Sequence, residues 1–582
     1  MSRDLSRRNF LSSSTKAAFA GIIFSEAHGI IDATRSSAFA DLAVSQATTL
    51  ETSSAALTRF DEFVARHMQE TGAPGLTLAI ASREGPLKIS AYGFADTRAG
   101  LRATPNTMFE IGSISKSFIS LTLLQLREEG KLDLNKPIAE YLPWLKINSK
   151  FEPITTNHIL SHTAGLPGAP LLLDALLSEL RTGYAPGNRF LYSNTGYNIL
   201  GFLIETIDKR PFADSVRARL LEPLGMTASS SVISHDIRRK IAVGYEPFNE
   251  GRPFPLHGPL AEAQWLEMDM AAGSIASTPA DMAKYLRMLL NRGALPKGRL
   301  VSEETFNLYT KPEVKAPFRG EEASYAYGFW VSNIEGHTRL RHTGGMVAFS
   351  SSIDVDLTSG VAAFASVNAN LHGYRPVAVT KYAIELLNAS LAGKPLPDAP
   401  PPPTPIDEVQ NAADYAGTFT ATDGRKLLLA AEGSKLILTH AGQRVVLERA
   451  GRDMFLVKHP DFSGFLLGFV RDKERVTEAF HGSDWYAGQN YAGPSVFDSP
   501  KEWAGYVGHY ANDSPWYGDT RILLRKGKLY SDGVQPLVPR GDGKFGIGNT
   551  EGPDWIEFGS IINGRAMRLS FSGILFRRTF TP

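Results

Sequence analysis

The chain has 582 residues, which is enough for about two to four domains of ordinary size. Its 61 basic and 60 acidic side chains leave a formal net charge of +1, so there is no electrostatic footprint for nucleic acid. The sequence contains no cysteine, which excludes disulfides, thiolate catalysis and cysteine-based zinc sites.

Residues 1–40 have the composition of an export signal. The stretch SRRNFL, residues 6–11, resembles the twin-arginine signal, and the apolar residues 17–24 follow it. Small residues at 38–40 offer a cleavage site to a signal peptidase. The apolar run of 8 residues is far shorter than the about 20 needed to span a bilayer, and no later segment is apolar enough. We therefore expect a periplasmic or secreted protein without a membrane span; a frayed basic N-terminus is the alternative.

Residues 53–393 mix short apolar strands with amphipathic helices, which predicts an α+β domain with an antiparallel sheet flanked by helices. The stretch GLTLAIAS, residues 75–82, and the aromatic stretch at 88–96 are expected to form a hairpin of that sheet. Helical spacing of apolar residues predicts helices over 118–132, 280–293 and 377–393. Gly130 is expected to end the first, and Thr278 or Ser277 to cap the second ahead of Pro279.

Ser113 and Lys116 lie three residues apart in FEIGSISKSF, residues 109–118, where a helix is expected to begin. Positions i and i+3 share a helix face, so the hydroxyl and the amine would project together. A lysine with a pKa lowered by burial can take the proton from a serine hydroxyl, and a helix N-terminus favours developing negative charge. Gly112 would let the backbone approach closely. The spacing is common by chance, so the pair alone does not identify an active site.

His158 and His162 lie four residues apart in NHILSH, residues 157–162, a spacing that could hold zinc. No third ligand is evident, and no phosphate-binding glycine loop follows a strand. We therefore expect neither a metal nor a cofactor.

Tyr192 and Asn194 precede another amphipathic helix. A tyrosine hydroxyl near a lysine can shuttle protons, and an asparagine amide offers a donor and an acceptor to a substrate. The alternative is a core aromatic followed by an asparagine that caps the helix.

His342, Thr343, Gly344 and Gly345 precede a strand-like segment. Small residues on an edge strand let a substrate backbone pair alongside, and an N–H group there could complete an oxyanion hole with that of Ser113. A glycine turn between two hairpin strands is the alternative.

A proline-rich linker at 394–406 separates this domain from a region of β-type segments. In that region YAGTF at 415–419 recurs as YVGHY at 506–510, and FHG at 480–482 recurs as FSG at 571–573. Both shifts are 91 residues, which predicts two similar modules at 407–496 and 500–582. Each is expected to be a small all-β barrel of up-and-down strands.

The second module contains a turn-rich stretch, ANDSPWYGDT at 511–520, with Trp516 and Tyr517 at its tip. The corresponding stretch of the first module, TATDGR at 420–425, has no aromatic residue. Exposed aromatics at a loop tip favour a contact surface, which could reach the active site. The alternative is that both rings pack on their own barrel.

The three motifs, in this order, resemble those of the serine β-lactamase-like hydrolases, which include penicillin-binding DD-peptidases, class C β-lactamases and related esterases and aminopeptidases. The resemblance covers roughly residues 55–390, and it extends to flanking words such as ILSHTAGLP, YSNTGYNILG and AAGSIASTPADMAKY. It implies that Ser113 is the acylated nucleophile, with Lys116 and Tyr192 exchanging protons. Substrate binding would then fall to Asn194, His342, Thr343, Gly344 and Gly345.

His342 stands where class C β-lactamases usually have lysine, as in DD-peptidases and D-aminopeptidases, which argues against efficient β-lactam hydrolysis. Two lipocalin-like modules also follow the catalytic domain in D-aminopeptidase-type relatives. By resemblance we expect an exported serine peptidase or amidase, of carboxypeptidase or D-aminopeptidase type, acting on small peptides that can contain D-residues. The alternatives are an esterase or weak β-lactamase on the same machinery, and a non-catalytic penicillin-binding sensor or cell-wall binder.

Overall fold

The computed structural model describes residues 54–168, 180–248, 253, 258–371, 374–541 and 543–579. The expected export signal therefore lies outside the described residues. Within them, no helix combines the length and the apolar character that a membrane span requires. An α+β domain is followed by two closed β-barrels, which confirms the expected fold class.

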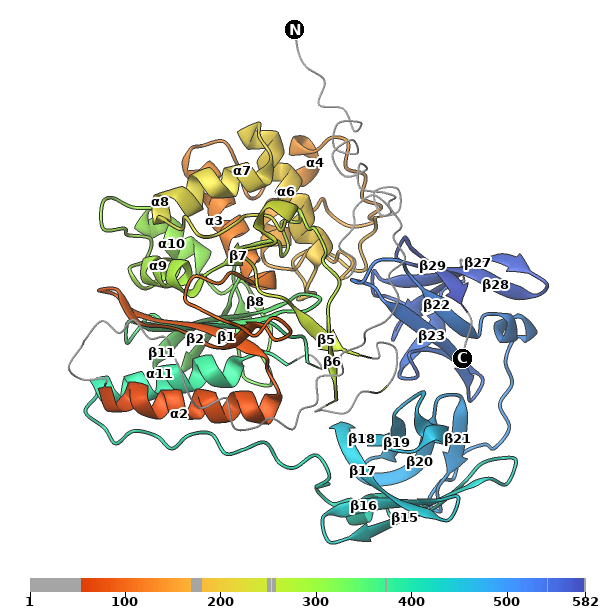
Figure 1. Cartoon of the computed structure of the whole chain (residues 1–582). Helices are drawn as coiled ribbons and strands as arrows, with labels where there is room; N and C mark the ends of the chain where they lie inside the picture. Colours follow the sequence, from red (N-terminus) through yellow and green to blue (C-terminus); the bar gives the residue numbers. More distant parts are fainter. Residues whose placement is uncertain are drawn as a thin grey trace. The chain divides into compact units, whose positions relative to one another are not determined.

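A nine-stranded antiparallel sheet lies at the centre of the α+β domain, in the order β3-β2-β1-β13-β12-β11-β10-β9-β8 (Figure 1). Its strands are β1 (Gly75–Ser82), β2 (Pro86–Asp96), β3 (Leu101–Arg102), β8 (Val314–Lys315), β9 (Ser324–Tyr325), β10 (Trp330–Ile334), β11 (His337–Gly345), β12 (Ser350–Asp356) and β13 (Val361–Val367). The predicted hairpin of β1 and β2 is confirmed. Since β1 also pairs with β13, the two ends of the domain meet in mid-sheet.

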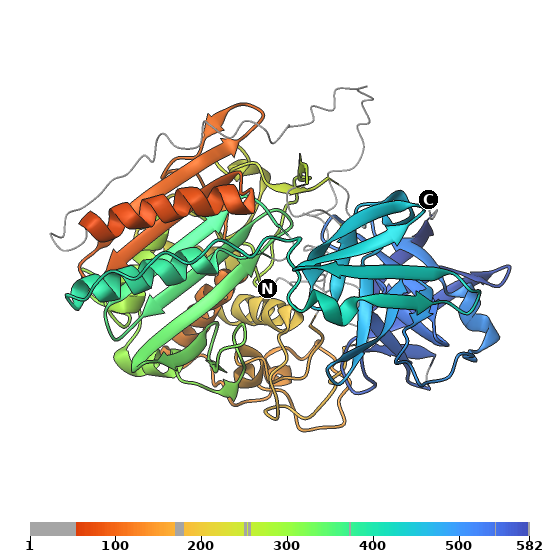
Figure 2. The same ribbon diagram turned by 90° about the horizontal axis from the view of Figure 1, so that it is seen from below.

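Each face of the sheet is covered by helices because side chains alternate along the strands. Leu76, Leu78 and Ile80 of β1 join a core with α2 (Ser54–Thr71) and α11 (Val377–Leu391). Figures 1 and 2 show these two helices side by side on that face. Ala79 and Ala81 point the other way, into the larger core built on α3 (Ser115–Glu128), α6 (Asn194–Asp208) and α9 (Pro279–Leu290).

The three predicted helices are α3, α9 and α11, and their ends follow local chemistry. Gly130, at φ +70°, follows the end of α3. The Thr278 hydroxyl caps α9 by accepting from the N–H of Asp281, with Pro279 as the first helical residue. Shorter elements complete the domain: α4 (Ile138–Tyr141), α5 (Thr156–Leu160), α7 (Phe212–Val216), α8 (Glu222–Leu224), α10 (Glu303–Tyr309), β4 (Phe109–Glu110), β5 (Tyr245–Pro247), β6 (Leu260–Glu262) and β7 (Ala276–Ser277).

The proline-rich linker contains no helix or strand between residues 394 and 405. Its backbone is held along α2, because Arg59 donates to the carbonyl oxygens of Leu396 and Pro397 and Arg66 donates to that of Pro400. The linker thus packs against the domain that it leaves.

Two closed antiparallel barrels of eight strands follow, each with strands in sequence order, as predicted from the repeat. The first contains β14 (Gly417–Thr420), β15 (Lys426–Glu432), β16 (Lys435–His440), β17 (Gln443–Gly451), β18 (Met454–Val457), β19 (Leu467–Asp472), β20 (Arg475–His481) and β21 (Asp484–Ala487). The second contains β22 (Gly508–Ala511), β23 (Asp519–Arg525), β24 (Lys528–Ser531), β25 (Gln535–Pro539), β26 (Lys544–Ile547), β27 (Trp555–Ile562), β28 (Arg565–Phe571) and β29 (Ile574–Thr579). Each barrel has its own apolar core.

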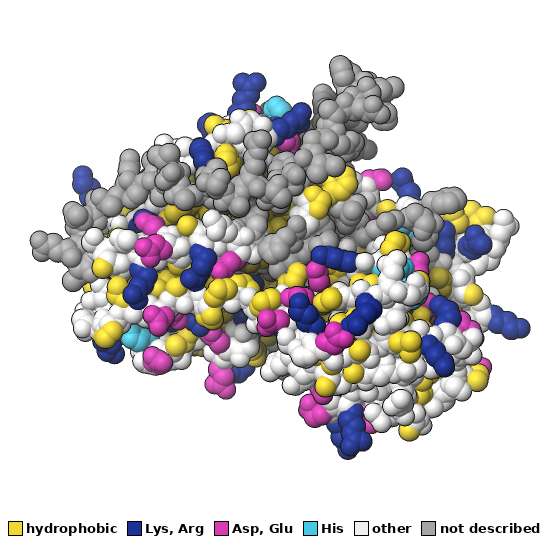
Figure 3. All heavy atoms as spheres, turned by 60° about the horizontal axis from the view of Figure 1, so that its bottom comes forward, with side chains coloured by type: hydrophobic (Ala, Val, Ile, Leu, Met, Phe, Trp, Pro, Cys, Tyr) yellow, Lys and Arg dark blue, Asp and Glu magenta, His cyan; other side chains and the backbone are white. Residues whose placement is uncertain are grey.

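Charged side chains of both signs are intermixed on the face of the molecule that Figure 3 shows. This agrees with the near-zero net charge. No block of one sign on that face suggests a surface for a polyanion.

Candidate active site

Ser113 and Lys116 lie where a short 3-10 turn, η1 (Gly112–Ile114), leads into α3. The Lys116 Nζ atom is 3.1 Å from the Ser113 Oγ atom. The expected projection of both groups from the start of one helix is therefore present in the structure, with Ser113 in the turn and Lys116 in the first turn of α3.

Lys116 is completely buried, and its Nζ atom has two further partners. These are the Asn194 Oδ1 atom at 2.8 Å and the Ala272 carbonyl oxygen at 2.7 Å. Burial lowers the pKa of Lys116 well below its usual value, and no carboxylate among the described residues forms an ion pair with it. Burial therefore favours the neutral form of this amine.

Asn194 reaches Lys116 because a different residue caps the helix that follows. The Ser193 hydroxyl accepts from the N–H of Gly196 and so caps α6. Asn194 is the first residue of the helix and points its amide at Lys116.

Tyr192 lies over the same lysine, with the centre of its ring 4.9 Å from Nζ. The ring stacks on Trp330 at 6.0 Å and packs on His162 at 4.3 Å. Burial raises the pKa of Tyr192 above its usual value, although a hydrogen bond with Ser113 and the charge of Arg375 oppose this. Tyr192 thus stays a phenol at neutral pH.

The end of β11 meets the Ser113 turn through glycines. Gly112 has φ +52°, and a Cβ atom placed there would lie 2.7 Å from the backbone nitrogen of Gly345. A Cβ on Gly344 would overlap with the Ile111 carbonyl oxygen. Only glycine permits this approach, which brings the backbone of Ser113 beside that of Gly345.

The expected edge strand is only partly an edge. β11 lies inside the sheet, paired with β12 as far as Gly345 and with β10 only as far as Arg341. Residues 342–345 therefore have no strand partner on the β10 side, and an extended substrate could pair there. Thr343 and Gly345 are partly exposed, whereas His342 and Gly344 are buried.

His342 is 1% exposed, and both of its ring nitrogens are hydrogen-bonded. Nδ1 donates to the Thr343 carbonyl oxygen at 2.7 Å, and Nε2 accepts from the Tyr325 hydroxyl at 3.2 Å. Burial is the main cause that lowers the pKa of His342 to about 3, so the ring is neutral. The two hydrogen bonds of His342 thus hold the end of β11 in place, and its neutral ring contributes no charge to the site.

Sequence reasoning missed Arg375, whose guanidinium group lies beside Gly345, and Arg319, whose charge acts on Arg375. Arg375 donates to the Ser350 hydroxyl and to the Tyr374 carbonyl oxygen, and a Cβ on Gly345 would overlap with its guanidinium group. Burial and then the charge of Arg319 lower the pKa of Arg375. Neither arginine forms an ion pair with an acid in the described part of the chain. Each lies in a loop outside the three motifs, so no local pattern marks it.

The second barrel contacts the α+β domain close to this site. Trp516 packs against both apolar cores there, one containing Ile111 and the other Met346, the residue after Gly345. Tyr517 packs instead with its own barrel. The Asp554 carboxylate accepts from the N–H of Gly168 at 3.2 Å. Trp516 therefore contacts the α+β domain and Tyr517 packs on its own barrel, while the reach of this loop to the active site stays a prediction.

His158 and His162, the pair with zinc-like spacing, each accept a hydrogen bond from a backbone N–H group. The Nδ1 atom of His158 accepts from the N–H of Thr155 in a capping box, and that of His162 accepts from the N–H of Ser193. His162 thereby orients the segment between Tyr192 and Asn194.

Comparisons with known proteins agree with this geometry. A family model described as Beta-lactamase matches residues 60–387. Protein flp of Staphylococcus aureus (strain N315) is 25% identical over 350 residues, covering 57% of this chain and 66% of that protein, just under two thirds. A teichoic acid D-alanine hydrolase of S. aureus (strain MRSA252) is 28% identical over 262 residues, covering 42% of this chain and 60% of that protein.

A solved structure has a similar fold. The octameric penicillin-binding protein homologue from Pyrococcus abyssi aligns with a TM-score of 0.53 and 23% identity, covering 74% of this chain and 99% of that one. At this identity the likeness concerns the fold alone.

Proposed function

This chain belongs to the beta-lactamase family, and we propose from that premise that it is a serine hydrolase that forms an acyl-enzyme at Ser113. The family generally consists of serine hydrolases. Ser113 acts as nucleophile, Lys116 as base, and Tyr192 as proton relay.

The observation that carries the proposal is the number of partners around Lys116. A neutral amine has two N–H groups and one lone pair. Asn194 Oδ1 and the Ala272 carbonyl oxygen can only accept, so they take the two N–H groups. The lone pair is then left for the Ser113 hydroxyl, at 3.1 Å. This is the arrangement of a general base with its nucleophile.

The reaction follows from this arrangement. As Lys116 takes the hydroxyl proton, Ser113 Oγ attacks the substrate carbonyl, and the N–H groups of Ser113 and Gly345 stabilise the oxyanion. Lys116 returns the proton through the Tyr192 phenol to the departing amine as the C–N bond breaks. A water molecule then attacks the acyl-enzyme, and the same groups transfer its proton. Asn194 orients Lys116, and residues 342–345 pair with the substrate backbone.

We propose small peptides and amides, including those with D-residues, as the substrates. The free edge at residues 342–345 supports an extended backbone in the site. The Arg375 guanidinium group beside Gly345, which forms no ion pair with any described acid, supports an acidic group near the scissile bond. The teichoic acid D-alanine hydrolase among the relatives makes D-alanyl esters the second candidate, on the same acyl-enzyme chemistry.

A Ser113→Ala variant tests the mechanism. It should lose turnover of every substrate and all labelling by a fluorophosphonate or a fluorescent penicillin, with an unchanged melting temperature, because only the nucleophile is removed. Normal turnover by this variant would contradict the proposal.

A substrate panel then separates the activities. It contains D- and L-aminoacyl amides, D-Ala-D-Ala peptides, D-alanyl esters, linear peptides and a chromogenic β-lactam. For an amide and an ester of the same acyl group, the rate of acylation is divided by the rate of uncatalysed hydrolysis. A larger ratio for the amide supports a peptidase. Stable one-to-one labelling by penicillin without turnover of any panel member would instead indicate a penicillin-binding sensor.

We also propose that residues 1–40 direct export through the twin-arginine route. Replacing Arg7 and Arg8 by lysines should leave the protein in the cytoplasmic fraction of its bacterial host. Unchanged export of that variant would argue against the signal.

A further inference from the structure

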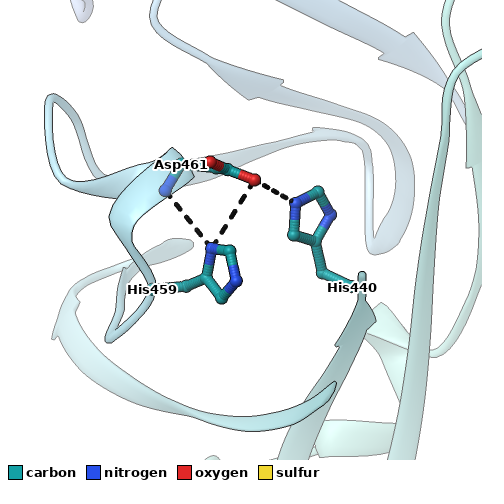
Figure 4. A group of neighbouring side chains, drawn as sticks. All are labelled: His440, His459 and Asp461. Carbon is teal, nitrogen blue, oxygen red and sulfur yellow. Dashed lines mark hydrogen bonds and ion pairs between the residues drawn. The ribbon is translucent and has the colours of Figure 1, made fainter. Parts of the chain in front are cut away.

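Two histidines and an aspartate converge on the first barrel. His440 is the last residue of β16, His459 follows β18, and Asp461 lies in the short helix η5 (Pro460–Phe462). Figure 4 shows both imidazole rings turned toward the Asp461 carboxylate. Two segments of the chain thus supply the three side chains: the end of β16 gives His440, and the turn at η5 gives His459 and Asp461.

The spacing of the three groups suits a metal ion. Nε2 of His440 is 2.7 Å and Nδ1 of His459 is 3.7 Å from the Asp461 Oδ2 atom. One ligand atom from each residue lies within 4.8 Å of the other two. Ligand atoms around tetrahedral zinc are about 3.3 Å apart when each bond is about 2.0 Å, so small side-chain rotations would suffice.

The cluster is supported on one side and open on the other. The His459 side chain is 10% exposed and accepts from the N–H of Asp461 at 3.2 Å. The His440 ring packs on Phe462 at 5.1 Å, which limits its rotation. The Asp461 carboxylate is 63% exposed, so an ion held here would keep positions for water. Metal binding would replace the His440–Asp461 hydrogen bond and the backbone bond to His459.

The barrel fold itself does not require this cluster, because the second barrel has the same strand order without it. The strand equivalent to β16 is β24, which ends at Ser531 where β16 ends at His440. The connection equivalent to the one that carries His459 and Asp461 is residues 548–554, between β26 and β27, and it contains no histidine. That segment contacts the α+β domain instead, through Glu551 and Asp554. The equivalent turns of the two modules have therefore taken different roles.

We propose that His440, His459 and Asp461 form a binding site for a divalent transition-metal ion of the zinc class on the first barrel. Two imidazoles and one carboxylate are a donor set that zinc accepts in proteins, with the remaining position open. The ion would join the end of β16 to η5 and would be independent of hydrolysis at Ser113.

Titration of the purified full-length chain with Zn²⁺ or Co²⁺, after chelator treatment, tests the site. We expect one equivalent to bind, with visible Co²⁺ absorption typical of four or five ligands. The variants His440→Gln, His459→Gln and Asp461→Asn should each weaken binding at least about tenfold. Hydrolysis should be unchanged in all three.

The matched control is His509→Gln, which removes a histidine paired with Asp519 in the second barrel, whose sequence at 500–582 contains no other histidine. It should bind the metal as well as the unaltered chain does. The proposal is overturned if the unaltered chain shows no saturable binding, or if the three cluster variants bind as tightly as it does. Asp461→Asn keeps this test interpretable should a histidine variant misfold, since its side chain is largely exposed.

Discussion

At the scale of single residues, Lys116 illustrates how a residue proposed for catalysis can lower the stability of the folded protein. Its amine is buried with no described acid paired to it, and its hydrogen-bond partners are a hydroxyl, an amide oxygen and a backbone carbonyl oxygen. Burial alone is the cause of its lowered pKa. The folded chain therefore binds a proton on this lysine less tightly than the unfolded chain does.

That difference predicts how stability depends on pH. Because the folded pKa of Lys116 is lowered, the unfolded state binds one more proton between that pKa and about 10.5. The free energy of unfolding should therefore rise with pH, relative to a Lys116→Met variant, by about 1.4 kcal/mol per pH unit. Denaturant unfolding of both proteins at pH 7, 8 and 9 measures the slope.

The Lys116→Met variant is its own control, since every other titrating group is shared. Its turnover should fall by several orders of magnitude, because the Ser113 hydroxyl loses its base. A stability difference that does not change between pH 7 and 9 would mean that Lys116 is protonated in the folded protein.

At the scale of elements, the sequence predicted what depends on local patterns. Helix α9 begins after Thr278, and α3 ends before Gly130, because caps and glycines act within a few residues. The role of Ser193 as the cap of α6 could not be separated from that of Asn194, since both residue types cap helices well. Strand pairing, by contrast, depends on residues far apart in the sequence. β11 lies inside the sheet, and its edge toward β10 is unpaired only beyond Arg341, because the pairing with β10 stops there.

The contact between the Ser113 turn and β11 gives a prediction about two glycines. Gly112→Ala should lower kcat about 10²- to 10³-fold, the cost of losing one oxyanion donor, because the new Cβ would lie 2.7 Å from the Gly345 nitrogen and push the strand away. Steady-state kinetics with a chromogenic ester measures this.

Gly130→Ala is the matched control for backbone strain. Gly130 has φ +70°, similar to Gly112, but no atom lies within 4 Å of a Cβ placed there. Each substitution should destabilise the fold by about 1–2 kcal/mol, whereas only Gly112→Ala should lose activity. Equal losses of kcat in the two variants would show that strain, rather than the approach to Gly345, is responsible.

At the scale of the whole molecule, parts of the candidate site come from segments outside the three sequence motifs. The Ala272 carbonyl oxygen and the Arg375 guanidinium group reach the site only because the sheet and the loops around it fold together. The repeat predicted two barrels, but not their different uses. Only the folded chain places Trp516 on the α+β domain while His440 and His459 meet on the first barrel.

The contact of Trp516 predicts that the second barrel restricts which substrates reach Ser113. Because Trp516 packs against the core that contains Met346, next to Gly345, Trp516→Ala should raise kcat/KM for large peptides over small amides by about tenfold. The control is Trp503→Ala, which removes a ring packed in the second barrel's own core. It should lower the barrel's stability and leave that ratio unchanged. If Trp516→Ala also leaves the ratio unchanged, the loop holds the barrel in place without limiting access, and substrate size must be selected by the α+β domain alone.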